Sequence, residues 1–234
     1  SFENVPKFLS LLDTSLGGSL GAFEVMWSEY YNFVSEYCPS LNLPISGKHA
    51  FYVLTESLET DPDGHGDRLS AVIEKAYQEG IIQNGVIAQS QSEREDLWAI
   101  REGAGEGFRA IAPIFTYDVS MPIPTMYDFG SRAISEIESI YTGAKTLIFG
   151  HLGDGNLHAV VAAGDGSDQA HSRINDIIYG IVRDLDGSVS AEHGIGTEKR
   201  EYLSWSRTEA EINLMRTLKN TLDPKGILNP GKVI

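Results

Sequence analysis

The stretch IFGHLGDGNLHAVV at residues 148–161 consists of two apolar segments separated by a short, glycine-containing turn. Its two ends predict strands at 146–149 and 157–161, joined as a hairpin. The glycines and the asparagine of the turn favour a tight reversal because they tolerate positive φ. A hairpin in a chain that otherwise alternates strands with helices indicates an α+β sheet domain covered by helices. Which strands pair with which stays open.

Turn signals divide the rest of the chain into further segments. Apolar residues at helical spacing predict helices, and short apolar or alternating runs predict strands. The expected helices cover 5–13, a stretch from 28 to Cys38, 69–78, 93–100, 124–141, 170–185 and 208–222. The other expected strands cover 20–27, 49–56, 81–88, 113–120 and 188–191, and 61–67 is expected to be a loop.

The composition excludes several classes of protein. The chain has 234 residues, of which 41% are hydrophobic and 22% charged, and these proportions are those of a globular protein. Thirty-three acidic residues against 18 basic ones give a formal charge of −15. A field of that sign repels phosphate backbones and anionic lipids, so we expect no nucleic-acid partner. Small anionic substrates stay possible, because a metal or a local cluster of cations inverts the field inside a cleft.

Cys38 is the only cysteine, which excludes an intramolecular disulfide and a thiolate metal cluster. Together with the lack of a visible signal peptide, this fits a reducing compartment. We expect a cytoplasmic location, with attachment to a membrane through an electron acceptor as the alternative. No uncharged apolar run approaches the roughly 20 residues of a membrane span, so no transmembrane segment is expected. The chain starts at Ser1 without an initiator Met, as in a processed chain or a piece of a longer one.

His151 and His158 flank the predicted turn, seven residues apart. On one straight strand this odd spacing would place them on opposite faces, but a reversal brings them together at the ends of neighbouring strands. Two neutral imidazoles would form half of a zinc-type site. Alternatively, one histidine caps the turn and the other packs in the sheet. The spacing alone leaves both interpretations open.

A second segment, SVSAEHGIGTEKREYL at 188–203, places Glu192 and His193 at the end of a small-residue strand that runs into glycines. There both side chains can face one cleft, as a metal ligand and a general base. The alternative is an exposed acidic strand end. Combined with the two histidines, Glu192 would complete a His₂Glu set with an open coordination position, the mark of a catalytic metal.

Two more features are less specific. Arg101 follows a helical stretch with Leu97, Trp98 and Ile100, and its guanidinium can bind a carboxylate through two hydrogen bonds. A surface arginine fits the same pattern. The tail LDPKGILNPGKVI at 222–234 contains two proline–glycine turns, which fit docking across another domain or sealing of a sheet edge.

The motifs HLGDGNLH (151–158), SAEHGIGTEKREYL (190–203) and LDPKGILNPGKVI resemble the C-terminal domain of FAD-linked oxidases of the vanillyl-alcohol-oxidase superfamily. They are closest to its D-lactate and D-2-hydroxyglutarate dehydrogenase branch. LWAIRE at 97–102 and YDVSMP at 117–122 follow in family order, so the resemblance covers nearly the whole chain and predicts one such domain over 1–234. It implies a ferredoxin-like, largely antiparallel sheet covered by helices. It also implies the substrate-binding half of a flavoenzyme, whose N-terminal FAD-binding domain is absent from this chain.

The resemblance further implies roles for individual residues. It implies that a divalent metal, usually zinc, is held by His151, His158 and Glu192. It implies that His193 takes the proton of the substrate hydroxyl. The other implied roles are those of Arg101 as anchor of the substrate carboxylate, Asn156 in the same pocket, and Asn229 near the flavin.

The implied activity is that of an FAD-dependent dehydrogenase that oxidises a D-2-hydroxy acid to the 2-oxo acid and passes electrons to an unspecified acceptor. This chain alone is expected to be inactive without the FAD domain. Thr116 stands where many members of the family carry Lys. Because a neutral hydroxyl cannot replace a cation, we expect a monocarboxylate such as D-lactate. The alternatives are a metal-free flavin oxidase acting on another alcohol, and a non-catalytic subunit that keeps the fold.

Overall fold

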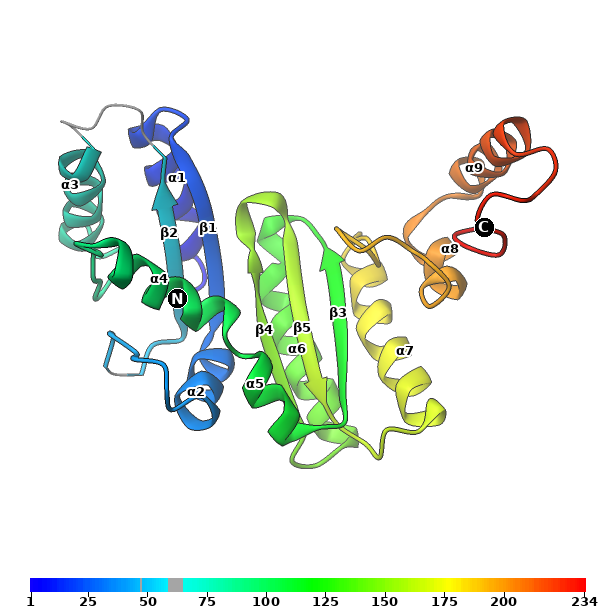
Figure 1. The fold of residues 1–234 in the computed structure, drawn as a ribbon, viewed down its shortest axis with the longest axis horizontal. Helices are drawn as coiled ribbons and strands as arrows, with labels where there is room; N and C mark the ends of the chain where they lie inside the picture. The colour runs from blue at the N-terminus through cyan, green and yellow to red at the C-terminus, as the bar shows by residue number, and fades with distance from the viewer. Residues whose placement is uncertain (47, 59–64) are drawn as a thin grey trace.

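The computed structural model describes residues 1–46, 48–58 and 65–234. Within them a five-stranded sheet has the order β2-β1-β4-β5-β3, and every neighbouring pair is antiparallel (Figure 1). This confirms the expected α+β class with a largely antiparallel sheet. The strands are β1 (Leu20–Trp27), β2 (Phe51–Ser57), β3 (Ile114–Ser120), β4 (Lys145–His151) and β5 (Asn156–Ala162).

The predicted hairpin is formed by β4 and β5, with a short 3₁₀ turn, Leu152–Asp154, between them. Gly155 closes the turn at φ 74°, a left-handed conformation that glycine adopts without steric cost. A Cβ at Gly150 would lie 2.6 Å from the carbonyl oxygen of Asn156, so β5 can approach β4 this closely only because residue 150 is glycine.

The second half of the sheet has the ferredoxin-like arrangement. The chain runs through β3, α6 (Met126–Ile140), β4, β5 and α7 (Asp168–Asp184). After α7, Ser188 forms an antiparallel bridge with Ser120, the last residue of β3. The spatial order of these segments, 188–β3–β5–β4, is that of a split βαβ unit. The strands β1 and β2 extend this sheet beyond β4.

Helices cover both faces of the sheet, and each face has its own apolar core. Along β1, Phe23, Val25 and Trp27 join one core whereas Met26 joins the other, as the alternation of a strand requires. The first core packs against α1 (Asn4–Leu16), α3 (His65–Gln78), α6 and α7. The opposite face, here called the α2–α4 face, packs against α2 (Ser28–Tyr37), α4 (Gln91–Glu102) and α5 (Gly105–Phe108).

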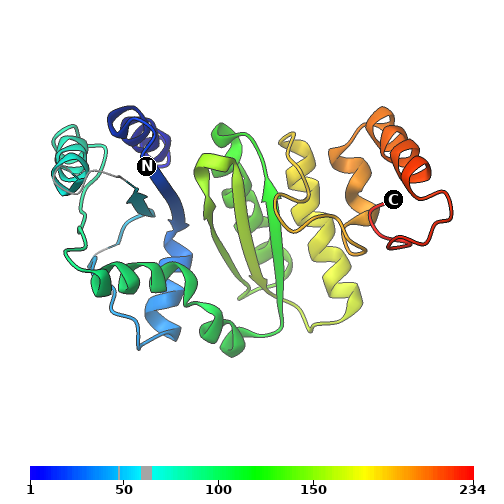
Figure 2. The same ribbon diagram turned by 45° about the horizontal axis from the view of Figure 1, so that its top comes forward.

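The C-terminal part extends away from the sheet. Both views place α9 (Glu209–Leu222) beyond α7, at the end of the molecule that carries the C-terminus (Figures 1 and 2). A capping box formed by Thr208 and Glu211 fixes the start of α9. The remaining short elements are η1 (Arg109–Ile111), η2 (Ile123–Thr125), η4 (Arg200–Tyr202) and α8 (Leu203–Ser206).

Two expected strands are wrong. Residues 81–88 form no strand, because their apolar side chains Ile81 and Ile82 pack on the first core while their backbone pairs with no described strand. At 188–191 only Ser188 pairs with the sheet. The chain then leaves the sheet, because the N–H of Val189 donates to Oγ of Ser206 and the N–H of Ala191 donates to the side chain of Asp118 instead of to a strand. Of the loop expected at 61–67, residues 61–64 lie outside the described part of the chain. The helix α3 begins at His65.

Candidate metal and substrate site

Strand register aligns four polar residues on the α2–α4 face. Asp118 on β3 pairs with His158 on β5, which pairs with Phe149 on β4. Two residues beyond Phe149, His151 pairs with Glu24 on β1. Paired residues, and residues two apart on one strand, share a face of the sheet. We call Asp118, His158, His151 and Glu24 the polar row.

The hairpin brings the two histidines together. The ring centroids of His151 and His158 lie 5.3 Å apart, with an angle of 85° between the ring planes. His151 precedes the 3₁₀ turn without capping it through its side chain. The interpretation of one histidine as a turn cap is therefore wrong, and both imidazoles face the same space.

The loop after Ser188 adds a carboxylate and a third imidazole. Oε1 of Glu192 lies 3.6 Å from Nε2 of His151. One ligand atom from each of His151, His158 and Glu192 lies within 4.8 Å of the other two, which is the spacing of a metal-binding set. The ring of His193 stacks over that of His158 at a centroid distance of 6.3 Å. Glu192 and His193 are both exposed, so the set opens to solvent on this side.

Asp118 holds this loop in place. Its Oδ2 atom accepts hydrogen bonds from three consecutive backbone N–H groups, those of Ala191 at 3.1 Å, Glu192 at 2.9 Å and His193 at 2.9 Å. Burial by itself would raise the pKa of Asp118. The N–H groups of His193 and Glu192 and the charge of Lys199 outweigh burial, and the pKa of Asp118 lies below its ordinary value.

Glu24 joins the polar row to Arg101. Its side chain is 3% exposed, and its Oε2 accepts a hydrogen bond from Nε of Arg101 at 2.7 Å. Its Oε1 contacts Nδ1 of His151. This contact directs the other ring nitrogen, Nε2, toward Glu192. The guanidinium of Arg101 also lies over the ring of Phe149, 4.5 Å from its centroid.

The environment of His158 favours its neutral form. Burial, followed by the positive charges of Arg101 and His151, lowers the pKa of His158 below its ordinary value, although Asp118 and Glu192 oppose the shift. A neutral imidazole presents the lone pair that a metal ion requires.

Asn156 lies at the start of β5, two residues before His158, and is therefore on the same face. It is 2% exposed, and neither its amide nitrogen nor its oxygen has a hydrogen-bond partner in the described protein. A buried polar group without a partner costs on the order of 1–3 kcal/mol, and such groups concentrate at functional sites. This amide is available to a group bound beside the histidines.

Asn229 is not part of this assembly. It is exposed, has φ 48°, and no contact in the described structure joins it to the polar row or to Glu192. The tail that carries it returns to the loop beyond His193, where N–H of Val233 donates to the carbonyl of Gly196 at 2.8 Å.

The sequence motifs do not identify three residues of this assembly: Glu24, Asp118 and Lys199. Glu24 is a single charge in the otherwise apolar run AFEVMW, and Asp118 is a single charge in YDVSM. An isolated charge inside a predicted buried strand is the signal that could have identified both, because such charges are rarely buried without a partner.

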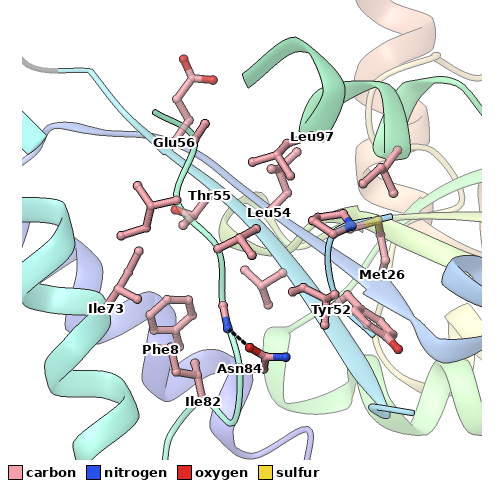
Figure 3. Close-up of a pocket in the computed structure, with 18 of the residues that line it drawn as sticks. Phe8, Met26, Tyr52, Leu54, Thr55, Glu56, Ile73, Ile82, Asn84 and Leu97 are labelled. Atoms are coloured by element: carbon pink, nitrogen blue, oxygen red, sulfur yellow. Dashed lines mark hydrogen bonds between the residues drawn. The ribbon is translucent and has the colours of Figure 1, made fainter. Parts of the chain in front are cut away.

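A cavity of about 700 Å³ lies elsewhere, along the edge strand β2 (Figure 3). Its walls are mainly apolar and include Phe8, Leu54, Ile73 and Leu97. None of the polar row or of the 190–196 loop lines it, so it is separate from the histidines and carboxylates described above.

Comparisons with known proteins give a consistent result. Residues 1–233 match the family model described as "FAD linked oxidases, C-terminal domain". The D-2-hydroxyglutarate dehydrogenase of Rattus norvegicus is 34% identical over 241 residues, covering 100% of this chain and 44% of that protein. A putative D-lactate dehydrogenase of Schizosaccharomyces pombe is 33% identical over 243 residues, covering 100% and 46%. The chain thus spans less than half the length of these relatives.

Two solved structures share the fold. Alkyldihydroxyacetonephosphate synthase has a TM-score of 0.59 at 13% identity, covering 98% of this chain and 42% of that one. Substrate-bound p-cresol methylhydroxylase has a TM-score of 0.57 at 11% identity, covering 100% and 50%. In the described part of this chain, every helix is too short or too polar to cross a membrane.

Proposed function

Because this chain belongs to the family of FAD-linked oxidase C-terminal domains, we propose that it is the substrate- and metal-binding part of an FAD-dependent D-2-hydroxy-acid dehydrogenase. The observation that carries the proposal is the convergence of His151, His158 and Glu192 on one space. Relatives named as D-2-hydroxyglutarate and D-lactate dehydrogenases support the substrate class. The reaction converts the 2-hydroxy acid into the 2-oxo acid.

The donor set fits a divalent ion such as zinc. Two imidazole nitrogens and one carboxylate oxygen are the ligands of many catalytic zinc sites. Glu24 leaves Nε2 of His151 directed toward the other donors, and the lowered pKa of His158 keeps its ring neutral. When bound there, such an ion lowers the pKa of a coordinated hydroxyl group.

His193 is the proposed proton acceptor. Its ring stands beside His158, and its backbone is fixed by Asp118. A ring nitrogen of a histidine takes up a proton readily near neutral pH. Transfer of the hydroxyl proton to His193, together with departure of hydride from C2, leaves the 2-oxo acid. FAD, held mainly by the N-terminal domain, would be the hydride acceptor.

Arg101 and Asn156 are the proposed contacts for the substrate carboxylate and the oxygen atoms beside it. In the described structure only Nε of Arg101 donates a hydrogen bond, so the terminal guanidinium nitrogens are left for an anion. Asn156 contributes its unpartnered amide. Asn229, on the tail, is proposed to lie near a flavin that is held mainly by an N-terminal domain.

Thr116 supports a monocarboxylate substrate such as D-lactate. It lies on β3, exposed and two residues before Asp118, so it is on the face of the polar row. A hydroxyl at this position provides no charge for a second carboxylate. The names of the relatives include both substrates, so a comparison of D-lactate with D-2-hydroxyglutarate as substrates tests this choice.

A cytoplasmic location is also part of the proposal, supported by the single cysteine. Several relatives carry "mitochondrial" in their names, so the mitochondrion is the alternative. Fractionation of cells that express the natural protein distinguishes the two compartments.

The reaction is tested by His193→Ala in the polypeptide that includes the FAD-binding part. We expect flavin reduction by D-lactate to be lost while zinc content stays normal. His171→Ala is the matched control, because His171 stacks on Phe115 away from the polar row. Normal flavin reduction by the His193→Ala protein would contradict the proposed role of His193.

A further inference from the structure

The carboxylate of Asp118 makes an unusual set of contacts for a side chain in the middle of a strand. Asp118 is 1% exposed, yet one of its oxygens accepts three consecutive N–H groups of a loop that is itself exposed. These donors belong to residues 191–193, more than 70 positions away in sequence. The loop is therefore fixed to β3 through a side chain rather than through strand pairing.

Lys199 reinforces this attachment. It is 8% exposed, and its Nζ donates to the carbonyl oxygen of Asp118 and to Oγ of Ser190, each at 3.1 Å. Its Nζ also lies 3.7 Å from Oδ2 of Asp118, so the buried carboxylate has a buried counter-charge. Oγ of Ser190 in turn donates to the carbonyl of Gly194 at 2.9 Å. Ser190 and Gly194, the two ends of the 190–194 loop, are thereby linked through Lys199 to Asp118 on β3.

The second oxygen of Asp118 faces His158. Oδ1 is buried, has no hydrogen-bond partner in the described protein, and lies 4.0 Å from Nδ1 of His158. One carboxylate thus stands between the sheet-borne histidine and the loop that carries Glu192. Because the side chains of Glu192 and His193 are exposed, packing does not fix their direction, and the backbone attachment does.

We propose that Asp118, supported by Lys199, is the positioning residue that holds Glu192 and His193 against the two sheet-borne histidines. The inference rests on the proposed function, since it takes Glu192 as a metal ligand and His193 as the proton acceptor. In this proposal Asp118 acts through its hydrogen bonds to the backbone of the loop and is not one of the three metal ligands. Residues that orient metal ligands in this way typically change metal affinity about 10- to 100-fold when they are replaced.

The test compares Asp118→Val with Asp118→Asn in the full chain. Valine suits a strand and removes both oxygens, whereas asparagine keeps one acceptor for the three N–H groups. The matched control is Asp223→Asn, because Asp223 also accepts two backbone N–H groups, of Ile227 and Leu228, but in the tail. Zinc affinity is measured by competition with a chromophoric chelator, and amide exchange of residues 190–194 by mass spectrometry without metal.

We expect zinc affinity to fall at least about tenfold in Asp118→Val, to recover in part in Asp118→Asn, and to stay unchanged in the control. Exchange at 190–194 is expected to accelerate in Asp118→Val. Unchanged affinity and unchanged exchange in that variant would overturn the proposal. If Asp118→Val does not fold, the double variant Asp118→Val/Lys199→Met, which leaves no buried charge, gives the same test.

The proposed metal site and the positioning role of Asp118 can be refuted independently of each other. If the unaltered chain binds no zinc, the proposed metal site is wrong and amide exchange alone decides the role of Asp118. Faster exchange confined to 190–194 would then uphold the positioning role, and unchanged exchange would refute it. If the unaltered chain binds zinc and Asp118→Val binds it equally well, the metal site stands and the positioning role is refuted.

Discussion

Glu24 and Arg101 form an ion pair of 2.7 Å between Oε2 and Nε, although one residue lies on β1 and the other in the last turn of α4. The other oxygen of Glu24 contacts His151. One buried carboxylate therefore orients both the proposed anchor of the substrate carboxylate and a proposed metal ligand. Metal affinity and substrate affinity are expected to depend on it together.

Glu24→Gln tests this dependence. The amide is uncharged and interacts more weakly with both Arg101 and His151, so we expect zinc affinity to fall about tenfold and KM for the hydroxy acid to rise. Chelator competition measures zinc affinity, and steady-state kinetics of the polypeptide that includes the FAD-binding part measure KM, here and in the two predictions that follow. Glu56→Gln is the matched control, because Glu56 pairs with Arg94 of the same helix at 2.7 Å but lies outside the site. If Glu24→Gln and Glu56→Gln changed zinc affinity and KM equally, Glu24 would not orient Arg101 and His151 as proposed.

Arg101→Lys separates substrate binding from metal binding. Lysine keeps the charge but cannot offer the planar fork that binds a carboxylate through two hydrogen bonds. We expect KM to rise about tenfold while zinc content stays at the level of the unaltered protein, since a charged hydrogen bond contributes roughly 1.5–3 kcal/mol. An unchanged KM would exclude Arg101 as the carboxylate anchor.

Thr116→Lys is expected to shift the substrate preference. A cation on the face of the polar row would pair with a second carboxylate, and kcat/KM for D-2-hydroxyglutarate relative to D-lactate should rise about tenfold. Thr221→Lys on the exposed helix α9 adds the same charge away from the site and should leave this ratio unchanged. A ratio that stays constant in Thr116→Lys would show that the side chain at 116 does not face the substrate.

The attachment of the C-terminal tail to α9 through Asp223 is expected to weaken in acid. The hydrogen bond from Lys219, followed by the N–H groups of Leu228 and Ile227, lowers the pKa of Asp223 in spite of its burial. A carboxylate with a lowered folded-state pKa stabilises the fold above its unfolded value of about 3.9, and this contribution is lost as pH falls through the folded value. Titration of Asp223 by carboxyl-carbon NMR should give a pKa below about 3.9. A value at or above that number would contradict the attachment of the tail through Asp223.

The sequence allowed the α+β class, the hairpin and most helices to be predicted, because apolar periodicity and turn residues are local signals. The same turn allowed His151 and His158 to meet, but the spacing alone did not exclude a turn cap and a histidine packed in the sheet. Glu24 and Asp118 could not be placed from sequence, because their contacts depend on the register of β1 against β4 and of β3 against β5. The strand expected at 188–191 is wrong for a related reason, since side chains distant in sequence, Ser206 and Asp118, accept the N–H groups of Val189 and Ala191 that a neighbouring strand would otherwise bind. The metal-ligand roles of His151, His158 and Glu192 stay predictions. So do the roles of His193, Arg101, Asn156 and Asn229.

Zinc binding by the full chain tests the central claim most directly, measured by elemental analysis after dialysis beside His158→Ala and His49→Ala. His49 bonds Gln83, away from the polar row, and serves as the matched histidine control. We expect about one zinc ion per chain in the unaltered protein and in His49→Ala, and none in His158→Ala. Zinc content that is no higher in the unaltered chain than in His158→Ala would contradict the metal site formed by His151, His158 and Glu192.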